Sequence, residues 1–149
     1  MGFFKKIDTV CTSSESFKRM QRTEVDIQIE ANIERAGIQK FATSDYGDLY
    51  LRENELGGFL ILETIIVSAT NFKSKKGSAL TFISGAETLK LESDEHKVES
   101  DFSKAVNKSI TKIDYNISVE ESEELKKEKY DEVRFEINGN DLLFSVLTS

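Results

Sequence analysis

The stretch "FLILETIIVSAT", residues 59–70, decides the fold of this 149-residue chain. It is apolar on both faces of an extended backbone: Phe59, Ile61, Ile65 and Val67 alternate with Leu60, Leu62 and Ile66. Glu63 interrupts the run, which is also shorter than the roughly 20 residues that a membrane-spanning helix needs. We therefore predict a long central strand that is covered from both sides.

Shorter alternating segments flank this strand and are separated by turn signals. They are "LYLRE", "ALTFIS", "ETLKLE", "SITKIDYNI", "DEVRFEI" and "LLFSVL", with turns at "NELGG", Gly85 and "NGND". The pattern predicts a mainly β fold of the α+β type, either an antiparallel β-sandwich or a small barrel. The length fits a single domain spanning residues 1–149, to which residues 1–23 are loosely attached as an N-terminal segment.

Two segments carry helix signals instead. In "SVEESEELKKEKY", Ser118 stands three residues before Glu121, which is a capping-box signature. Acidic residues come first and lysines last, as the helix dipole favours, so we predict a helix over about residues 118–129. A short N-terminal helix within "SSESFKRMQR", with Ser14 as its N-cap, is the other candidate.

The segment "EVDIQIEANI", residues 24–33, fits two structures. Its apolar residues fall at every second position, which predicts a half-buried strand, and its β-branched side chains favour that reading. A helix competes, because Val25, Ile29 and Ile33 also share one helical face and Gly37 could end the helix. We expect a strand and leave the helix open as the alternative over residues 24–36.

Composition excludes several functional classes. A net charge of −7 repels phosphate backbones, so no nucleic-acid partner is expected, and no apolar run is long enough to imply a membrane. Cys11 is the only cysteine and the N-terminus lacks a secretory signal, which together predict a cytoplasmic protein. No cofactor is expected, because no phosphate-binding loop, dinucleotide fingerprint or nucleophile elbow is present.

The stretch "LESDEHKVESD", residues 91–101, contains the only histidine. On one continuous strand Glu92, Asp94 and His96 would share a face and could bind a divalent transition metal with one open position. The favoured interpretation is a solvated hairpin turn at "ESDE", flanked by two paired arms. A catalytic pair of Cys11 and His96 is not expected, because nothing in the sequence brings them together.

The loop "NFKSKKGSA" is the one locally basic turn. Lys73, Lys75, Lys76 and Gly77 could cradle a phosphate or a carboxylate. The favoured alternative is a solvated hairpin tip whose lysines discourage pairing with other chains.

These patterns favour a non-enzymatic binding or assembly module that acts through protein surfaces, with a protein partner or a second copy of the chain. One alternative is a small-molecule carrier with an apolar cavity inside a β-barrel, lined by Phe59, Ile61, Phe82 and Tyr115. The other is a metal-dependent enzyme that uses the cluster of acidic residues and His96.

Overall fold

The computed structural model describes residues 19–22, 24–74, 77–85, 87–93, 98–103, 108–127 and 129–147. Within these residues the chain forms two helices, α1 (Glu24–Arg35) and α2 (Val119–Lys127). It also forms ten strands: β1 (Gln39–Thr43), β2 (Gly47–Leu56), β3 (Phe59–Ser68), β4 (Lys73–Ser74), β5 (Ser78–Ser84), β6 (Glu87–Glu92), β7 (Val98–Ser103), β8 (Lys108–Ile117), β9 (Glu132–Ile137) and β10 (Asn140–Val146).

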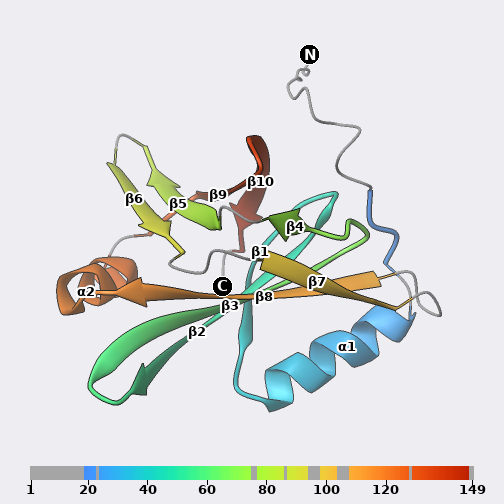
Figure 1. Cartoon of the computed structure of the whole chain (residues 1–149), viewed down its shortest axis with the longest axis horizontal. Coiled ribbons are helices and arrows are strands. Elements are labelled where there is room, and N and C mark those ends of the chain that lie inside the picture. Colours follow the sequence, from blue (N-terminus) through green and yellow to red (C-terminus); the bar gives the residue numbers. More distant parts are fainter. Residues whose placement is uncertain are drawn as a thin grey trace.

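The strands pair in the order β4-β7-β8-β3-β2-β1-β10-β9-β5-β6, and every pairing is antiparallel. The sheet curls into a half-barrel, with α1 lying along the outside of β2, β3 and β8 (Figure 1). The predicted mainly β, antiparallel fold is therefore confirmed, and so is the helix in the C-terminal half.

The central strand is β3, which pairs with β2 along its whole length and with β8 from Leu60 onward. Its side chains from Thr64 to Ser68 are buried on both faces. Ile66 belongs to the main core, on the face that also holds Phe82 and Phe135, whereas Ile65 belongs to a second cluster under α1. The prediction of a strand covered from both sides is confirmed for this second half, where α1 supplies the second cover, whereas Phe59 is exposed.

The predicted strand at residues 24–33 is wrong, since this segment is α1. Ile29 and Ile33 pack against the second cluster. Positions four apart satisfy a period of two and a period of 3.6 equally, so the alternation did not distinguish the two structures. The residues at the end of the helix do distinguish them. Gly37 has φ +87°, and its N–H donates to the Glu34 carbonyl at 2.9 Å. The Ile38 N–H donates to the Ile33 carbonyl at 3.3 Å. These two bonds form a Schellman motif.

Two predicted hairpins are also wrong. The loop after β3 does not return the chain beside β3, because β4 pairs with β7 and β5 pairs with β9 and β6. The connection after β6 likewise leads to β7, which pairs with β8 at the other end of the strand order. Polar residues signal that a strand ends, but they do not say which strand comes next in the sheet.

The capping box at the start of α2 is confirmed. The Ser118 N–H donates to Glu121 Oε1 at 2.9 Å, and the Glu121 N–H donates to Ser118 Oγ at 3.0 Å. The helix α2 also contacts β2, where Ser122 Oγ donates a hydrogen bond to the carboxylate of Glu53. This hydrogen bond lowers the pKa of the Glu53 carboxyl. The capping box defines the first residue of α2, and the hydrogen bond to Glu53 holds the helix against β2.

We expect Ser118→Ala to lower the free energy of unfolding by about 1 kcal/mol, because the Glu121 N–H loses its acceptor. Urea denaturation followed by circular dichroism measures this change. Val119→Ala is the matched control: Val119 is largely exposed at the next position, so its truncation should change stability by less than about 0.5 kcal/mol. Equal effects of the two substitutions would contradict the role of the cap.

Candidate functional site: an open strand edge beside a pinned turn

The residues of the predicted metal site are not brought together by the described part of the chain. Glu92 is exposed at the end of β6, while Asp94 and His96 lie outside the described residues. Among the residues that the structure describes, no group of three His, Cys, Asp or Glu side chains is placed to hold a metal ion. Cys11 is also outside the described residues, so the structure tests neither the metal alternative nor the expectation that Cys11 and His96 form no catalytic pair.

The predicted anion-binding loop is described only in part. Lys73 begins β4 and stands opposite Glu99 of β7, and Gly77 is buried with φ +77°. Lys75 and Lys76 lie outside the described residues. Gly77 has a positive φ, which glycine adopts without strain. The described residues do not test the anion-binding alternative.

The four residues of the predicted carrier cavity do not share one surface. Phe82 and Tyr115 are fully buried in the main core, where the Tyr115 hydroxyl lies 2.8 Å from Ser78 Oγ. Phe59 is 72% exposed, and Ile61 alternates with the core-facing residues of β3. The aromatic side chains of the core are used in packing, as the edge-to-face pair of Phe41 and Phe82 illustrates, with ring centroids 5.9 Å apart.

Sequence reasoning did not identify the most distinctive surface of the sheet, which lies where β1 and β10 meet. These strands share only two Cα pairs, Ala42 with Val146 and Thr43 with Ser145, and one further hydrogen bond from the Leu147 N–H to the Phe41 carbonyl. β1 ends at Thr43 and the chain turns into β2. Within the described chain, the first half of β10 therefore has a strand on only one side.

The register of β10 shows which backbone groups face this open side. The two-residue turn between β9 and β10 makes Ile137 and Asn140 the first hydrogen-bonded pair, and such pairs recur at every second residue. Leu142 and Phe144 therefore bond to β9, whereas Asp141 and Leu143 direct their N–H and C=O groups the other way. The backbone N–H and C=O groups of Ser145 point to the same side as those of Asp141 and Leu143, toward β1, which agrees with the pairing of Ser145 and Thr43.

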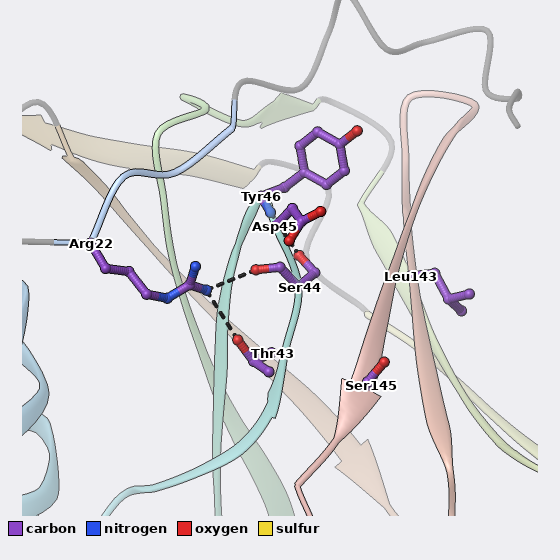
Figure 2. A pocket seen from close by; sticks show the side chains of 7 residues that line it. All are labelled: Arg22, Thr43, Ser44, Asp45, Tyr46, Leu143 and Ser145. Atoms are coloured by element: carbon purple, nitrogen blue, oxygen red, sulfur yellow. Dashed lines mark hydrogen bonds between the residues drawn. The ribbon is translucent and has the colours of Figure 1, made fainter. Parts of the chain in front are cut away.

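A surface pocket of about 430 Å³ lies between this edge and the turn that joins β1 to β2 (Figure 2). Its lining residues are Arg22, Thr43, Ser44, Asp45, Tyr46, Leu143 and Ser145. Leu143 is 47% exposed. Strand β6, at one end of the strand order, differs, because its exposed residues include Glu87, Lys90 and Glu92. Charges protect a sheet edge from pairing with other chains. The open part of β10 carries one charged residue, Asp141, and an exposed leucine, Leu143.

The turn that forms the opposite wall is held firmly. Ser44 Oγ accepts hydrogen bonds from the N–H groups of Tyr46 at 3.0 Å and Gly47 at 3.2 Å. Arg22 donates to the Ser44 carbonyl at 2.7 Å. A Cβ atom at Gly47 would stand 2.5 Å from the carbonyl oxygen of Val67, so this close approach to β3 requires glycine.

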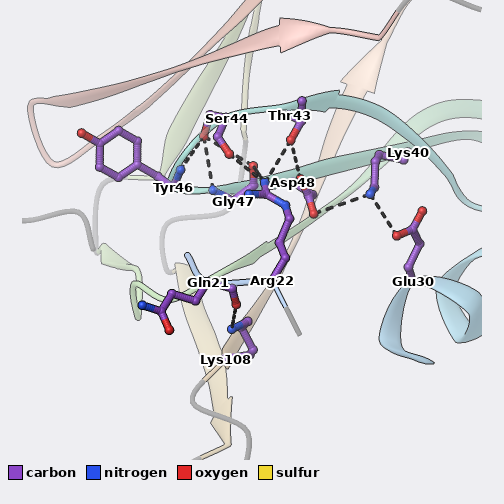
Figure 3. A network of polar contacts seen from close by, with 10 residues as sticks. All are labelled: Gln21, Arg22, Glu30, Lys40, Thr43, Ser44, Tyr46, Gly47, Asp48 and Lys108. Carbon is purple, nitrogen blue, oxygen red and sulfur yellow. Dashed lines mark hydrogen bonds and ion pairs between the residues drawn. The ribbon is translucent and has the colours of Figure 1, made fainter. Parts of the chain in front are cut away.

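A buried carboxylate fastens the turn to the rest of the protein (Figure 3). Asp48, only 4% exposed, accepts hydrogen bonds from Arg22 at 2.7 Å and from the Thr43 hydroxyl at 2.6 Å. Its other oxygen lies 3.7 Å from Lys40 Nζ, which in turn donates to Glu30 of α1 at 3.0 Å. The network therefore links α1, the segment before it and the first two strands.

The same network changes the titration of a neighbouring phenol. Burial is the main cause that raises the pKa of Tyr50, and the nearby carboxylates of Glu30 and Asp48 add to it. Sequence reasoning missed this cluster. Its one local signal is an acidic residue, Asp48, placed directly before the apolar run "LYL".

Residues 19–22 run along this wall of the pocket. The Met20 N–H donates to the Asp45 carbonyl at 2.9 Å, and Lys108 Nζ of β8 donates to the Gln21 carbonyl at 2.8 Å. The Arg19 guanidinium lies 3.4 Å from the Asp45 carboxylate and 5.9 Å from the centre of the Tyr46 ring. The pocket thus combines a fixed wall, an exposed apolar side chain and outward-facing backbone groups.

In the described parts of the chain, neither helix combines the length and apolar character needed to span a bilayer. Comparison with known proteins finds no match: no protein-family model, curated protein or solved structure is similar to this chain.

Proposed function

We propose that this chain is a non-enzymatic protein-binding module that binds an extended segment of a partner protein as an added strand on β10. One observation carries this proposal. Asp141 and Leu143 direct backbone N–H and C=O groups to a side of β10 that has no neighbouring strand within the described chain. In strand addition, such main-chain groups provide affinity and the side chains around the edge provide specificity.

The register favours an antiparallel partner. β1 pairs antiparallel with β10 and stops at Thr43, opposite Ser145. A partner strand that continues the line of β1 would place its next inward-facing residue opposite Leu143 and a later one opposite Asp141. This direction also matches the antiparallel pairing of the whole sheet.

The fixed turn supports binding as well. Arg22 and Ser44 hold the wall of the pocket through hydrogen bonds that exist before any partner arrives. A preformed wall lowers the conformational entropy that association has to overcome. The pocket can therefore bind an extended segment without rearrangement of the sheet.

Binding of peptides selected from a phage-displayed library of random decapeptides tests this function. We expect Leu143→Pro to weaken a selected peptide by more than about tenfold, since proline removes the N–H that would donate to the added strand. Leu143→Val is the matched control, because it keeps this N–H and an apolar side chain; fluorescence anisotropy should show binding within about threefold of the unchanged protein. Equal binding by the proline variant, or a library that yields no binder, would refute strand addition at β10.

A further inference from the structure

Two acidic side chains stand side by side at the open part of the sheet, one on β10 and one on the neighbouring strand β9. Asp141 stands directly opposite Glu136 of β9, so both carboxylates project from the same face of the sheet. No ion pair is found for either one among the described residues. Like charges directly opposite each other in a sheet are destabilising, whereas an opposite charge beside them is favourable.

The neighbouring position has a different character. Leu143 stands opposite Arg134, on the same face as Asp141 and two residues further along β10. A partner side chain opposite Leu143 would meet an exposed leucine, with a guanidinium one strand further away. This position therefore favours an apolar side chain and disfavours a basic one.

We propose, building on the function proposed above, that the partner segment carries an apolar residue followed two positions later by lysine or arginine. In an antiparallel strand the apolar residue lies opposite Leu143 and the basic residue lies opposite Asp141. The basic side chain then neutralises the carboxylates of Asp141 and Glu136 together. Side chains directly opposite across antiparallel strands have Cβ atoms about 4.5–5.5 Å apart, which is within reach of both carboxylates for a long basic side chain.

The opposite wall of the pocket, formed by the turn between β1 and β2, already binds one cationic side chain of this protein, Arg19. Arg19 contacts Asp45 and the ring of Tyr46, and the side chains of Arg19 and Asp45 are both largely exposed. The chain as a whole has a net charge of −7, which attracts basic segments before contact. Both facts support a basic partner, while the pairing of Asp141 with Glu136 specifies where its charge lies.

The test compares two synthetic peptides that differ only at the position opposite Asp141, one with lysine and one with glutamate. Both are derived from a decapeptide selected on the unchanged protein. We expect the lysine peptide to bind about fivefold more tightly, and Asp141→Lys to reverse this preference. Glu123→Lys changes the net charge equally on the exposed side of α2 and should leave the preference unchanged.

The outcomes separate this inference from the function on which it rests. Peptides that bind the unchanged protein and lose binding with Leu143→Pro, yet show the same preference with Asp141→Lys, would overturn the charge rule alone. Failure of both peptides to bind, or binding that Leu143→Pro leaves intact, would overturn strand addition as well. An equal shift in Asp141→Lys and Glu123→Lys would assign the preference to net charge and would also overturn the specific pairing.

Discussion

Proline at position 142 is expected to destabilise the protein by more than about 3 kcal/mol, whereas proline at position 143 should cost about 1 kcal/mol or less. The two residues are neighbours on β10 but point their backbone N–H groups in opposite directions. The N–H of Leu142 belongs to the ladder with β9, and the N–H of Leu143 faces the open edge. Proline is tolerated in a sheet only where no ladder bond is lost.

Side-chain loss has to be separated from the backbone effect. Leu142 is buried and Leu143 is exposed, so proline at position 142 also removes a core side chain. The alanine variants at both positions supply the correction, because each removes the same side chain and keeps the N–H. Urea denaturation of the four variants gives two proline-minus-alanine differences. Similar differences at the two positions would show that the edge at Leu143 is already paired.

Much of the fold was predictable because it depends on local signals. The two-sided apolar run of β3 requires cover on both faces, Ser118 and Glu121 cap a helix, and Asn138 and Gly139 adopt the positive φ values of a tight hairpin turn. Each of these features is encoded by residues that are close together in the sequence. The mainly β architecture follows from such segments added together.

What could not be predicted depends on contacts between distant segments. Residues 24–33 form a helix because the outer face of β2 and β3 needs a cover, and that face exists only after the sheet has formed. The open edge has the same origin. "LLFSVL" looks like an ordinary closing strand, and Leu143 becomes an exposed edge residue only because β1 ends at Thr43. No pattern within "LLFSVL" contains that information. Residues 24–33 did carry a helical pattern, but the alternation competed with it until the cover required by the sheet decided between them.

The second large effect is expected at Asp48. We expect Asp48→Ala to lower the free energy of unfolding by about 3 kcal/mol, because it leaves the charges of Arg22 and Lys40 without their buried partner. This loss of stability is at the low end of the range for breaking a buried ion pair. The reason is that the Arg22 side chain is 41% exposed and can be hydrated once Asp48 is removed. The substitution also removes the acceptor of the Thr43 hydroxyl. Thermal and urea denaturation both measure the change.

Asp45→Ala is the matched control for this prediction, because Asp45 lies in the same turn and carries the same charge. Its ion pair with Arg19 is exposed on both sides, and such pairs contribute between zero and about 1 kcal/mol. A gap of about 2 kcal/mol between the two variants would therefore come from burial rather than from charge. Because Asp48 fastens the wall of the pocket through Arg22, Asp48→Ala should also weaken binding of a selected peptide. If Asp48→Ala were as stable as Asp45→Ala, the buried carboxylate would not be what holds the turn in place.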